Sequence, residues 1–361
     1  MRLRTRKYVR ASVIGAFRVP SGEFFSVLCV SGVVAVGVSR GPGAGLTSGA
    51  LVGFIFLTYR FLEPVAEFTE VFDQTQSAVA SLRRVIGVLD TPVGPPQNPE
   101  PHGLPDGPLG VDIEHVSFAY RSRVVGAAED LVLHDVTLHV PPGQVVAVVG
   151  RTGSGKTTLG RLVARFADPT KGRVLVGGVN IADVSNDELR SRLMVVPQEP
   201  FLFDDSILYN LRFSRPDATE QQCMESLASL DLADWLAGLP DGLHTRVGQR
   251  GASLSAGERQ LVALGRAALA DPDILILDEA TSSVDALTEV RLSRALEKLS
   301  RGRTTLTIAH RLSTASRADR VIVLEHGHVV EDGTHEGLLA AGGLYGTMYE
   351  SWIAATTMGQ S

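Results

Sequence analysis

Residues 150–158 read GRTGSGKTT, and they directly follow the apolar run QVVAVV at residues 144–149. The apolar run predicts a buried parallel strand, and the sequence GKTTLGRLVARF at 155–166 predicts a helix. A glycine-rich turn between a strand and a helix lets backbone N–H groups point inward, where they bind phosphate oxygens at the helix N-terminus. The stretch therefore predicts an α/β domain that binds a nucleotide.

Within this loop, each side chain has an expected role. Lys156 is predicted to reach the β- and γ-phosphates, and the Thr157 hydroxyl is predicted to ligate Mg²⁺. The remaining positions are expected to line bound ATP; they are Gly150, Arg151, Thr152, Gly153, Ser154, Gly155 and Thr158.

A second motif, DILILDEA at residues 273–280, supplies acidic groups. The run ILIL predicts a short buried strand, and Asp278 at its carboxyl end is expected to hold Mg²⁺ through water. Glu279 is placed to polarise the attacking water. An Asp-Glu pair after a strand is usually a solvated helix cap, but its pairing with the phosphate loop favours the catalytic interpretation.

The sequence LSAGERQ at residues 254–260 stands before DILILDEA and is expected to begin a helix. Together with the phosphate loop it resembles the ATPase domain of ABC transporters. The family pattern is Leu-Ser-Gly-Gly-Gln, so Ala256 and Glu258 depart from it, whereas Ser255 and Gly257 are retained. The resemblance implies that these four residues bind the nucleotide held by a second subunit.

Other sequence motifs of the family occur in the same order along the chain. By resemblance, Tyr120 stacks on adenine, Gln198 senses Mg²⁺ and contacts the membrane domain, and His310 touches the γ-phosphate. Asp285, in SSVD, belongs to the loop that crosses to the partner subunit and its nucleotide. TRVGQRG at 245–251 resembles a segment specific to exporters, with Gln249 where the family commonly has Glu.

Residues 1–90 are rich in Val, Phe, Leu and Gly, and they contain two apolar runs. We expect membrane helices at about 16–38 and 50–68, with the second continuing into the cytoplasm to about Asp90. The basic start MRLRTRKYVR predicts a cytoplasmic flank. A soluble apolar hairpin is the alternative.

The expected domain organisation has three parts. Residues 1–90 form a partial transmembrane domain, the proline-rich residues 91–108 form a linker, and residues 109–355 form the ATP-binding domain. The fold class is thus an α/β P-loop NTPase domain with a helical subdomain, preceded by an all-α two-helix membrane segment. The resemblance extends to the last two of six membrane helices in a half-transporter, so four preceding helices are missing.

Composition limits the alternatives. The net charge of −6 argues against a general nucleic-acid binder, which needs a basic surface. The two cysteines, Cys29 and Cys223, lie far apart, so neither a disulfide framework nor a thiolate metal site is expected.

The resemblance implies an ATPase of an ABC exporter, multi-pass in the inner (plasma) membrane with its ATP-binding domain in the cytoplasm. Its implied cofactors are ATP and Mg²⁺, and its implied partners are membrane lipid and a second half-transporter, identical or related. The exported substrate does not follow from the sequence. A non-transporting ATPase of the same superfamily and a regulatory partner of a separate membrane subunit are the alternatives.

Overall fold

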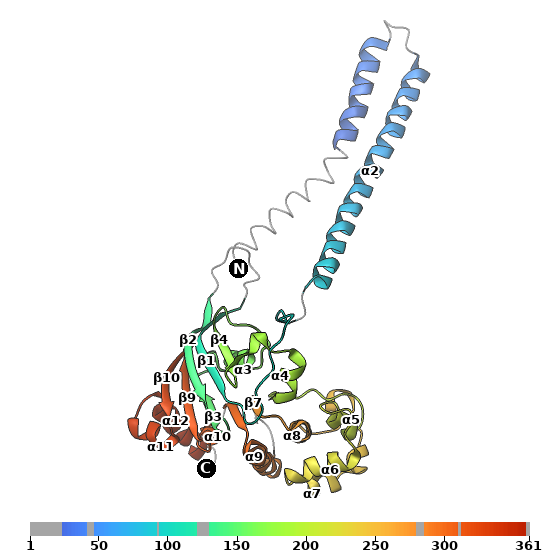
Figure 1. Cartoon of the computed structure of the whole chain (residues 1–361). Helices are drawn as coiled ribbons and strands as arrows, with labels where there is room; N and C mark the ends of the chain where they lie inside the picture. Colours follow the sequence, from blue (N-terminus) through green and yellow to red (C-terminus); the bar gives the residue numbers. More distant parts are fainter. Residues whose placement is uncertain are drawn as a thin grey trace. The chain divides into compact units, whose positions relative to one another are not determined.

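The computed structural model describes residues 24–41, 47–91, 94–120, 130–278, 285–309 and 312–358 (Figure 1). The chain divides into two compact units, Met1–Pro92 and Val93–Ser361. The second unit contains the phosphate loop, and the first contains the apolar runs of the sequence.

Two helices make up the described part of the first unit, namely Phe24–Gly41 and α2, Ser48–Leu89. Thr47 begins α2 as its N-cap, because its Oγ1 accepts a hydrogen bond of 3.3 Å from the Ala50 amide. By length and composition, both helices are able to cross a membrane. Residues 16–23, where the first span was expected to begin, lie outside the described residues.

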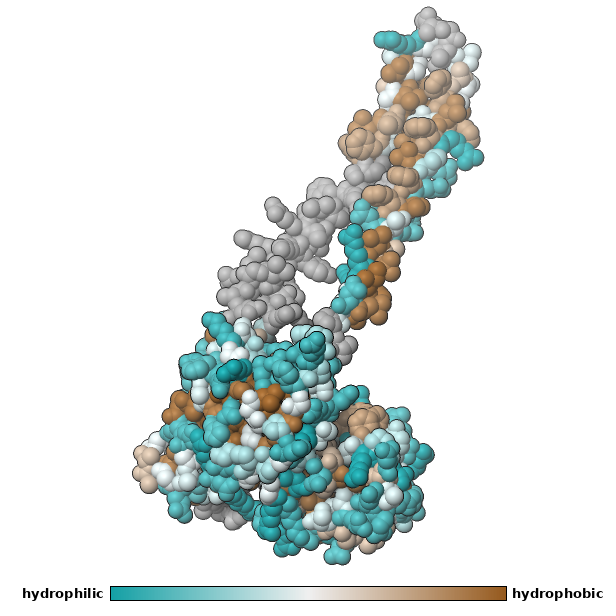
Figure 2. All heavy atoms as spheres, in the orientation of Figure 1, coloured by the Kyte–Doolittle hydropathy of each residue, from teal (hydrophilic) through white to brown (hydrophobic). Residues whose placement is uncertain are grey.

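The large apolar side chains of these helices are exposed; for example, Phe61 is 74% and Phe68 is 71% exposed. Figure 2 shows hydrophobic residues over the surface of both helices. With 42 residues, α2 is about 63 Å long at 1.5 Å per residue, which is roughly twice the hydrocarbon thickness of a bilayer. Its apolar surface therefore needs lipid or further protein to cover it.

The second unit contains two sheets. The first is antiparallel, in the order β2-β1-β4-β5, and the second runs β10-β9-β3-β8-β7-β6 and is parallel except for β10. The strands of the first sheet are β1 (Val111–Ala119), β2 (Leu131–Val140), β4 (Lys171–Val176) and β5 (Val179–Asn180). Those of the second are β3 (Val145–Val149), β6 (Leu193–Val196), β7 (Ile274–Asp278), β8 (Thr304–Ile308), β9 (Arg320–Glu325) and β10 (His328–Gly333).

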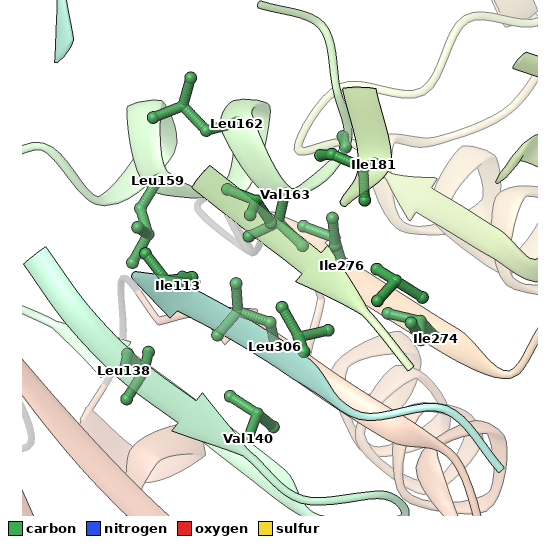
Figure 3. Close-up of a cluster of buried hydrophobic side chains, with 14 of the residues drawn as sticks. Ile113, Leu138, Val140, Leu159, Leu162, Val163, Ile181, Ile274, Ile276 and Leu306 are labelled. Carbon is green, nitrogen blue, oxygen red and sulfur yellow. The ribbon is translucent and has the colours of Figure 1, made fainter. Parts of the chain in front are cut away.

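Helix α3 (Lys156–Val163) packs in one core with both sheets. Figure 3 shows Leu159, Leu162 and Val163 of α3 beside side chains from the strands. The other labelled members of this core are Ile113, Leu138, Val140, Ile181, Ile274, Ile276 and Leu306. The helix that begins at the phosphate loop is thus held rigidly by apolar packing.

The opposite face of the parallel sheet is covered by other helices. Along β7, Ile274 and Ile276 join the core around α3, whereas Leu275 and Leu277 join a second core. Side chains alternate between the faces of a strand, so a strand covered on both faces is a continuous apolar run. This explains ILIL, and the structure confirms the predicted strands β3 and β7. The helix predicted over residues 155–166 is also present, but it is shorter than predicted: α3 ends at Val163, because Arg165 has a left-handed backbone with φ 52°.

The second core includes a helical subdomain, which corresponds to the expected one. Its helices are α5 (Ile207–Arg212), α6 (Glu220–Ser229), α7 (Ala233–Ala237), α8 (Ala256–Ala270) and α9 (Ala286–Ser300). The remaining described helices of the unit are α4 (Asn186–Arg192), α10 (Leu312–Ala315), α11 (His335–Ala341) and α12 (Leu344–Met358), with short 3-10 turns at Ile181–Asp183, Gly242–His244 and Gln249–Gly251.

Candidate functional site

The phosphate loop has the backbone that its glycines require. Gly150 has φ 150° and Gly155 has φ 103°, both in the region that favours glycine. A Cβ at Gly150 would collide with the carbonyl oxygen of Leu324, and one at Gly155 would lie 2.7 Å from Leu133 Cδ2. Only glycine fits these two positions, so the loop can close tightly at the N-terminus of α3.

Lys156 is buried at the first position of α3, with 6% of its surface exposed. Its Nζ donates hydrogen bonds to the carbonyl oxygens of Gly150 at 2.7 Å and Arg151 at 2.9 Å. Burial lowers the pKa of Lys156, and the nearby charge of Asp278 opposes that shift. The ammonium group therefore lies inside the loop, close enough to Asp278 for their charges to interact.

The loop also contains a polar group that suits a phosphate. Ser154 is 4% exposed, and its Oγ is buried without a hydrogen-bond partner among the described residues. A buried hydroxyl without a partner is costly unless a ligand supplies one. Together with the close-packed glycines, this hydroxyl shows that the loop fits a phosphate group.

A cavity of about 350 Å³ extends from the first turn of α3 to the ends of β6 and β7. Thr157, Asp278 and Tyr120 all line it, although they are far apart in sequence. Tyr120 is 47% exposed, its OH lies 3.2 Å from Thr158 Oγ1, and its ring meets Phe118 edge-on at 4.9 Å. A hydroxyl, a carboxylate and an exposed aromatic ring thus share one cavity.

Hard cations such as Mg²⁺ prefer oxygen ligands and usually combine one or two protein groups with phosphate oxygens and water. Thr157 and Asp278 provide such groups around this cavity. No group of three or more His, Cys, Asp or Glu side chains able to hold a metal occurs among the described residues. The donor set fits a magnesium ion held jointly with a phosphate.

A second cavity, of about 420 Å³, also borders the loop. Arg151 and Thr152 line it together with Lys156, Ala309 and side chains of α12, among them Trp352. Both Arg151 and Thr152 are exposed, whereas Thr158 is 7% exposed. Ala309 directly precedes His310, which lies outside the described residues, as does Glu279.

Gln198 lies directly after Pro197, which lines the first cavity, and its side chain is exposed. Its carbonyl oxygen accepts a hydrogen bond of 3.2 Å from Gln260 Nε2 of α8. This bond connects the Gln198 segment with the helix that begins at LSAGERQ.

The start of α8 is a capping box. The Glu258 amide donates to Ser255 Oγ at 3.2 Å, and the Ser255 amide donates to Glu258 Oε2 at 2.8 Å. Trp235 Nε1 also donates to Glu258 Oε1, at 3.3 Å. Burial raises the pKa of Glu258, but the bonds from Ser255 and Trp235 outweigh burial and lower the pKa overall. Glu258, at the position where the family pattern has Gln, thus fixes α8 to α7.

In the described part of the chain, residues 255–258, the signature residues below, line neither of the cavities that border the phosphate loop of the same chain. Ser255 and Ala256 are exposed and Gly257 is buried in α8. Asp285 is exposed and caps α9, because its Oδ1 accepts from the Thr288 amide at 3.0 Å. Hydrogen bonds from Thr288 lower the pKa of Asp285.

Sequence reasoning missed several residues near the site. Trp235 belongs to no recognisable motif. Its bond to Glu258 joins α7 to α8, and a contact between two helices leaves no local pattern in the sequence. An aromatic cluster lies at α5, in which the half-buried Phe203 contacts the exposed Phe201, Tyr209 and Phe213 with ring centroids 4.8 to 6.0 Å apart. The aromatic residues in PFLF, directly after Gln198 and Glu199, were its only sequence signal.

Comparison with known proteins agrees with this geometry. A family model described as ABC transporter matches residues 133–282. An ATP-dependent lipid A-core flippase of Ralstonia nicotianae is 38% identical over 355 residues, which are 97% of this chain and 59% of the relative. A fatty acid ABC transporter ATP-binding/permease protein of Mycobacterium bovis is 43% identical over 317 residues, covering 87% of this chain and 49% of the relative.

A solved structure of a bacterial Atm1-family ABC exporter with ATP bound has a TM-score of 0.68 and 33% identity. The match covers 91% of this chain and 56% of that one. The chain thus spans about half the length of the curated relatives it matches.

Proposed function

The chain belongs to the ABC transporter family, and we propose that it is the ATP-binding and ATP-hydrolysing subunit of an ABC exporter. The observation that carries the proposal is the single cavity in which Thr157 of the phosphate loop meets Asp278 and Tyr120. Sequence positions 120, 157 and 278 converge there, which is what a nucleotide with its metal requires.

In this proposal, ATP lies with its phosphates in the loop and its adenine on Tyr120. Lys156 exchanges its bonds to the Gly150 and Arg151 carbonyls for bonds to phosphate oxygens, and the Ser154 hydroxyl gains a partner. Thr157 and Asp278 would hold Mg²⁺, with Gln198 nearby, and the bound ion would neutralise phosphate charge. Glu279 orients and polarises the attacking water, and His310 contacts the γ-phosphate.

A second subunit completes the proposed site. Ser255, at the N-terminus of α8, is exposed and borders neither of the two cavities beside the phosphate loop of its own chain. A helix N-terminus and a serine hydroxyl suit a phosphate. We therefore place the signature of one subunit, Ser255 to Glu258, against ATP held by another, in a head-to-tail homodimer or heterodimer. Asp285 would lie in the loop that reaches across to the partner subunit.

The membrane role rests on the first unit and on the relatives. Two helices able to cross a bilayer precede the ATP-binding domain, and the relatives that match the chain include a flippase and a permease protein. We propose that the chain is anchored in the inner membrane with its second unit in the cytoplasm, and that further membrane helices supply the transport pathway. The exposed rings of the aromatic cluster at α5, Phe201, Tyr209 and Phe213, offer a surface for such helices to contact.

The test is ATP binding and hydrolysis by the full chain in lipid nanodiscs, with and without Mg²⁺. We expect hydrolysis that requires Mg²⁺, and binding of a fluorescent ATP analogue that unlabelled ATP displaces. Absence of binding would refute the proposal. Binding without any hydrolysis would refute the enzymatic role and favour a regulatory partner.

A further inference from the structure

Arg165 occupies a position that is usually glycine. It follows Ala164, the C-cap of α3, and has φ 52°. Its amide donates to Leu162 O at 3.0 Å, and the Phe166 amide donates to Arg161 O at 2.9 Å, as in helices that end with a left-handed residue. A non-glycine residue there is strained by roughly 1 kcal/mol, so the arginine side chain must offset that strain.

The side chain of Arg165 is buried, with 1% of its surface exposed. Its guanidinium donates to three carbonyl oxygens, those of Val184 at 2.8 Å, Ala182 at 2.9 Å and Pro96 at 2.9 Å. The carboxylate of Asp168 lies 3.6 Å from Nε. A buried charge is costly unless it is fully hydrogen-bonded, so any movement that breaks one of these bonds is unfavourable. The guanidinium is therefore held in place.

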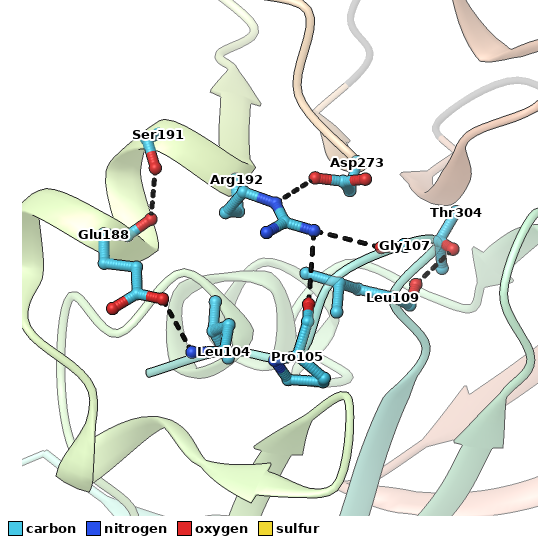
Figure 4. Close-up of polar contacts among 9 residues, drawn as sticks. All are labelled: Leu104, Pro105, Gly107, Leu109, Glu188, Ser191, Arg192, Asp273 and Thr304. Carbon is cyan, nitrogen blue, oxygen red and sulfur yellow. Dashed lines mark hydrogen bonds and ion pairs between the residues drawn. The ribbon is translucent and has the colours of Figure 1, made fainter. Parts of the chain in front are cut away.

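Pro96 belongs to the segment that continues the chain after α2. Residues 94–110 contain neither a helix nor a strand, yet polar groups hold them at several further points. The Leu104 amide donates to Glu188 Oε1 at 2.6 Å, and Arg192 donates to Gly107 O at 3.0 Å (Figure 4). Thr304 Oγ1 donates to Leu109 O at 2.5 Å.

The two ends of α3 therefore contact different parts of the molecule. Its first residues, Lys156 and Thr157, belong to the phosphate loop, and Arg165 beyond its last turn holds Pro96. Eight helical residues, about 12 Å, separate the two contacts. Because α3 is packed in the core, displacement at one end is transmitted to the other.

We propose that Arg165 is a positioning residue that couples nucleotide occupancy of the phosphate loop to the segment leading from α2. The inference rests on the proposed function, since it requires that the loop binds ATP. This coupling runs through α3 and uses neither Gln198 nor the aromatic cluster at α5. The coupling is reciprocal. If bound nucleotide favours one arrangement of the segment by a given factor, that arrangement raises the affinity of the loop for nucleotide by the same factor.

The test is hydrogen–deuterium exchange of the full chain in lipid nanodiscs, with and without AMP-PNP and Mg²⁺. Peptides covering residues 150–158 report nucleotide binding, and peptides covering residues 94–104 report the coupling. In the wild-type chain we expect AMP-PNP to slow exchange in both, by about fivefold or more in the 94–104 segment.

Two variants remove the coupling in different ways. Arg165→Gly relieves the left-handed strain and deletes the guanidinium, whereas Arg165→Lys keeps the charge but replaces the planar guanidinium fork with a compact ammonium group, which does not match the directions of the three carbonyl bonds. Both should keep protection of residues 150–158 and lose that of residues 94–104. The control is Arg190→Ala, because Arg190 donates to Ala164 O at 2.9 Å, a bond at the same helix end that involves no residue of the segment.

Different outcomes of this experiment test the proposed function and the coupling separately. If AMP-PNP does not protect residues 150–158 of the wild-type chain, the proposed function fails. If it protects them but leaves residues 94–104 unchanged, the coupling is refuted. The coupling is also refuted if both Arg165 variants retain protection of residues 94–104, or if Arg190→Ala removes it equally.

Discussion

The two units of this protein place the same residue types in opposite surroundings. In α2, Leu57 is 62% and Phe61 is 74% exposed, whereas in α3 Leu159 and Leu162 are fully buried. An α-helix satisfies its backbone hydrogen bonds internally, so α2 can exist in an apolar solvent without partners. The strands around α3 satisfy theirs only by pairing with one another.

This difference shows which unit carries a fold of its own. The second unit covers both faces of its parallel sheet with its own helices and so buries its apolar residues. The first unit leaves its apolar surface for lipid or further protein to cover. If this comparison holds, ATP chemistry and the stability that comes from packing are confined to the second unit.

The largest effect is expected from Lys156→Ala, which should reduce ATP binding and hydrolysis by on the order of 100-fold or more. The ammonium group inside the loop is lost, while the helices of the first unit are unchanged. Isothermal titration with ATP measures the binding, and Lys171→Ala, at the start of β4, is the control. Undiminished ATPase activity in Lys156→Ala would remove the phosphate-loop role.

Glu279→Gln should lower turnover by about 10²- to 10⁴-fold while ATP stays bound, because an amide cannot act as a base. The bound ATP should hold two copies of the second unit together. Single-turnover hydrolysis and sedimentation of the nanodisc-embedded chain, with ATP present, measure both effects. Wild-type turnover in this variant would exclude Glu279 as the residue that activates water.

A matched pair of truncations compares the two units directly. Leu162→Ala, in the core around α3, should lower the free energy of unfolding by about 2–5 kcal/mol. Leu57→Ala, in α2, should cost less than about 1 kcal/mol, because no cavity forms at an exposed site. Thermal unfolding in one lipid composition measures both, and equal costs would mean that protein packs against Leu57.

The smallest effect concerns Glu258, whose lowered pKa stabilises the fold above the pKa of the unfolded chain. That stability is lost as pH falls through the lower pKa of the folded state. Glu258→Gln should cost about 1 kcal/mol near neutral pH, because Ser255 and Trp235 donate to different oxygens of Glu258, and in Gln one of those oxygens becomes an NH₂ group that faces a donor.

The measurement for Glu258 is the melting temperature of the second-unit transition as a function of pH. The difference between wild type and Glu258→Gln should narrow in acid, and Glu225→Gln, on the exposed side of α6, is the control. A difference that does not change with pH would contradict the assignment of a charged Glu258.

Short-range features of the molecule could be predicted from the sequence. The strand, loop and helix around Lys156 and the buried strand ending at Asp278 followed from apolar patterns and glycine spacing. The resemblance to ABC transporters agrees with the family model that matches the chain. The roles of Glu279 and His310 stay predictions, because both lie outside the described residues.

From the sequence alone we could predict a phosphate-binding loop, two runs apolar enough for a membrane, and the family that the chain resembles. These properties depend on neighbouring residues, whose spacing sets local hydrogen bonding and periodicity. The structure was needed to show that Asp278 shares a cavity with Thr157, that Trp235 bonds Glu258, and that Arg165 bonds Pro96. Such contacts join residues far apart in the chain, and only the packing of complete sheets and helices brings them together.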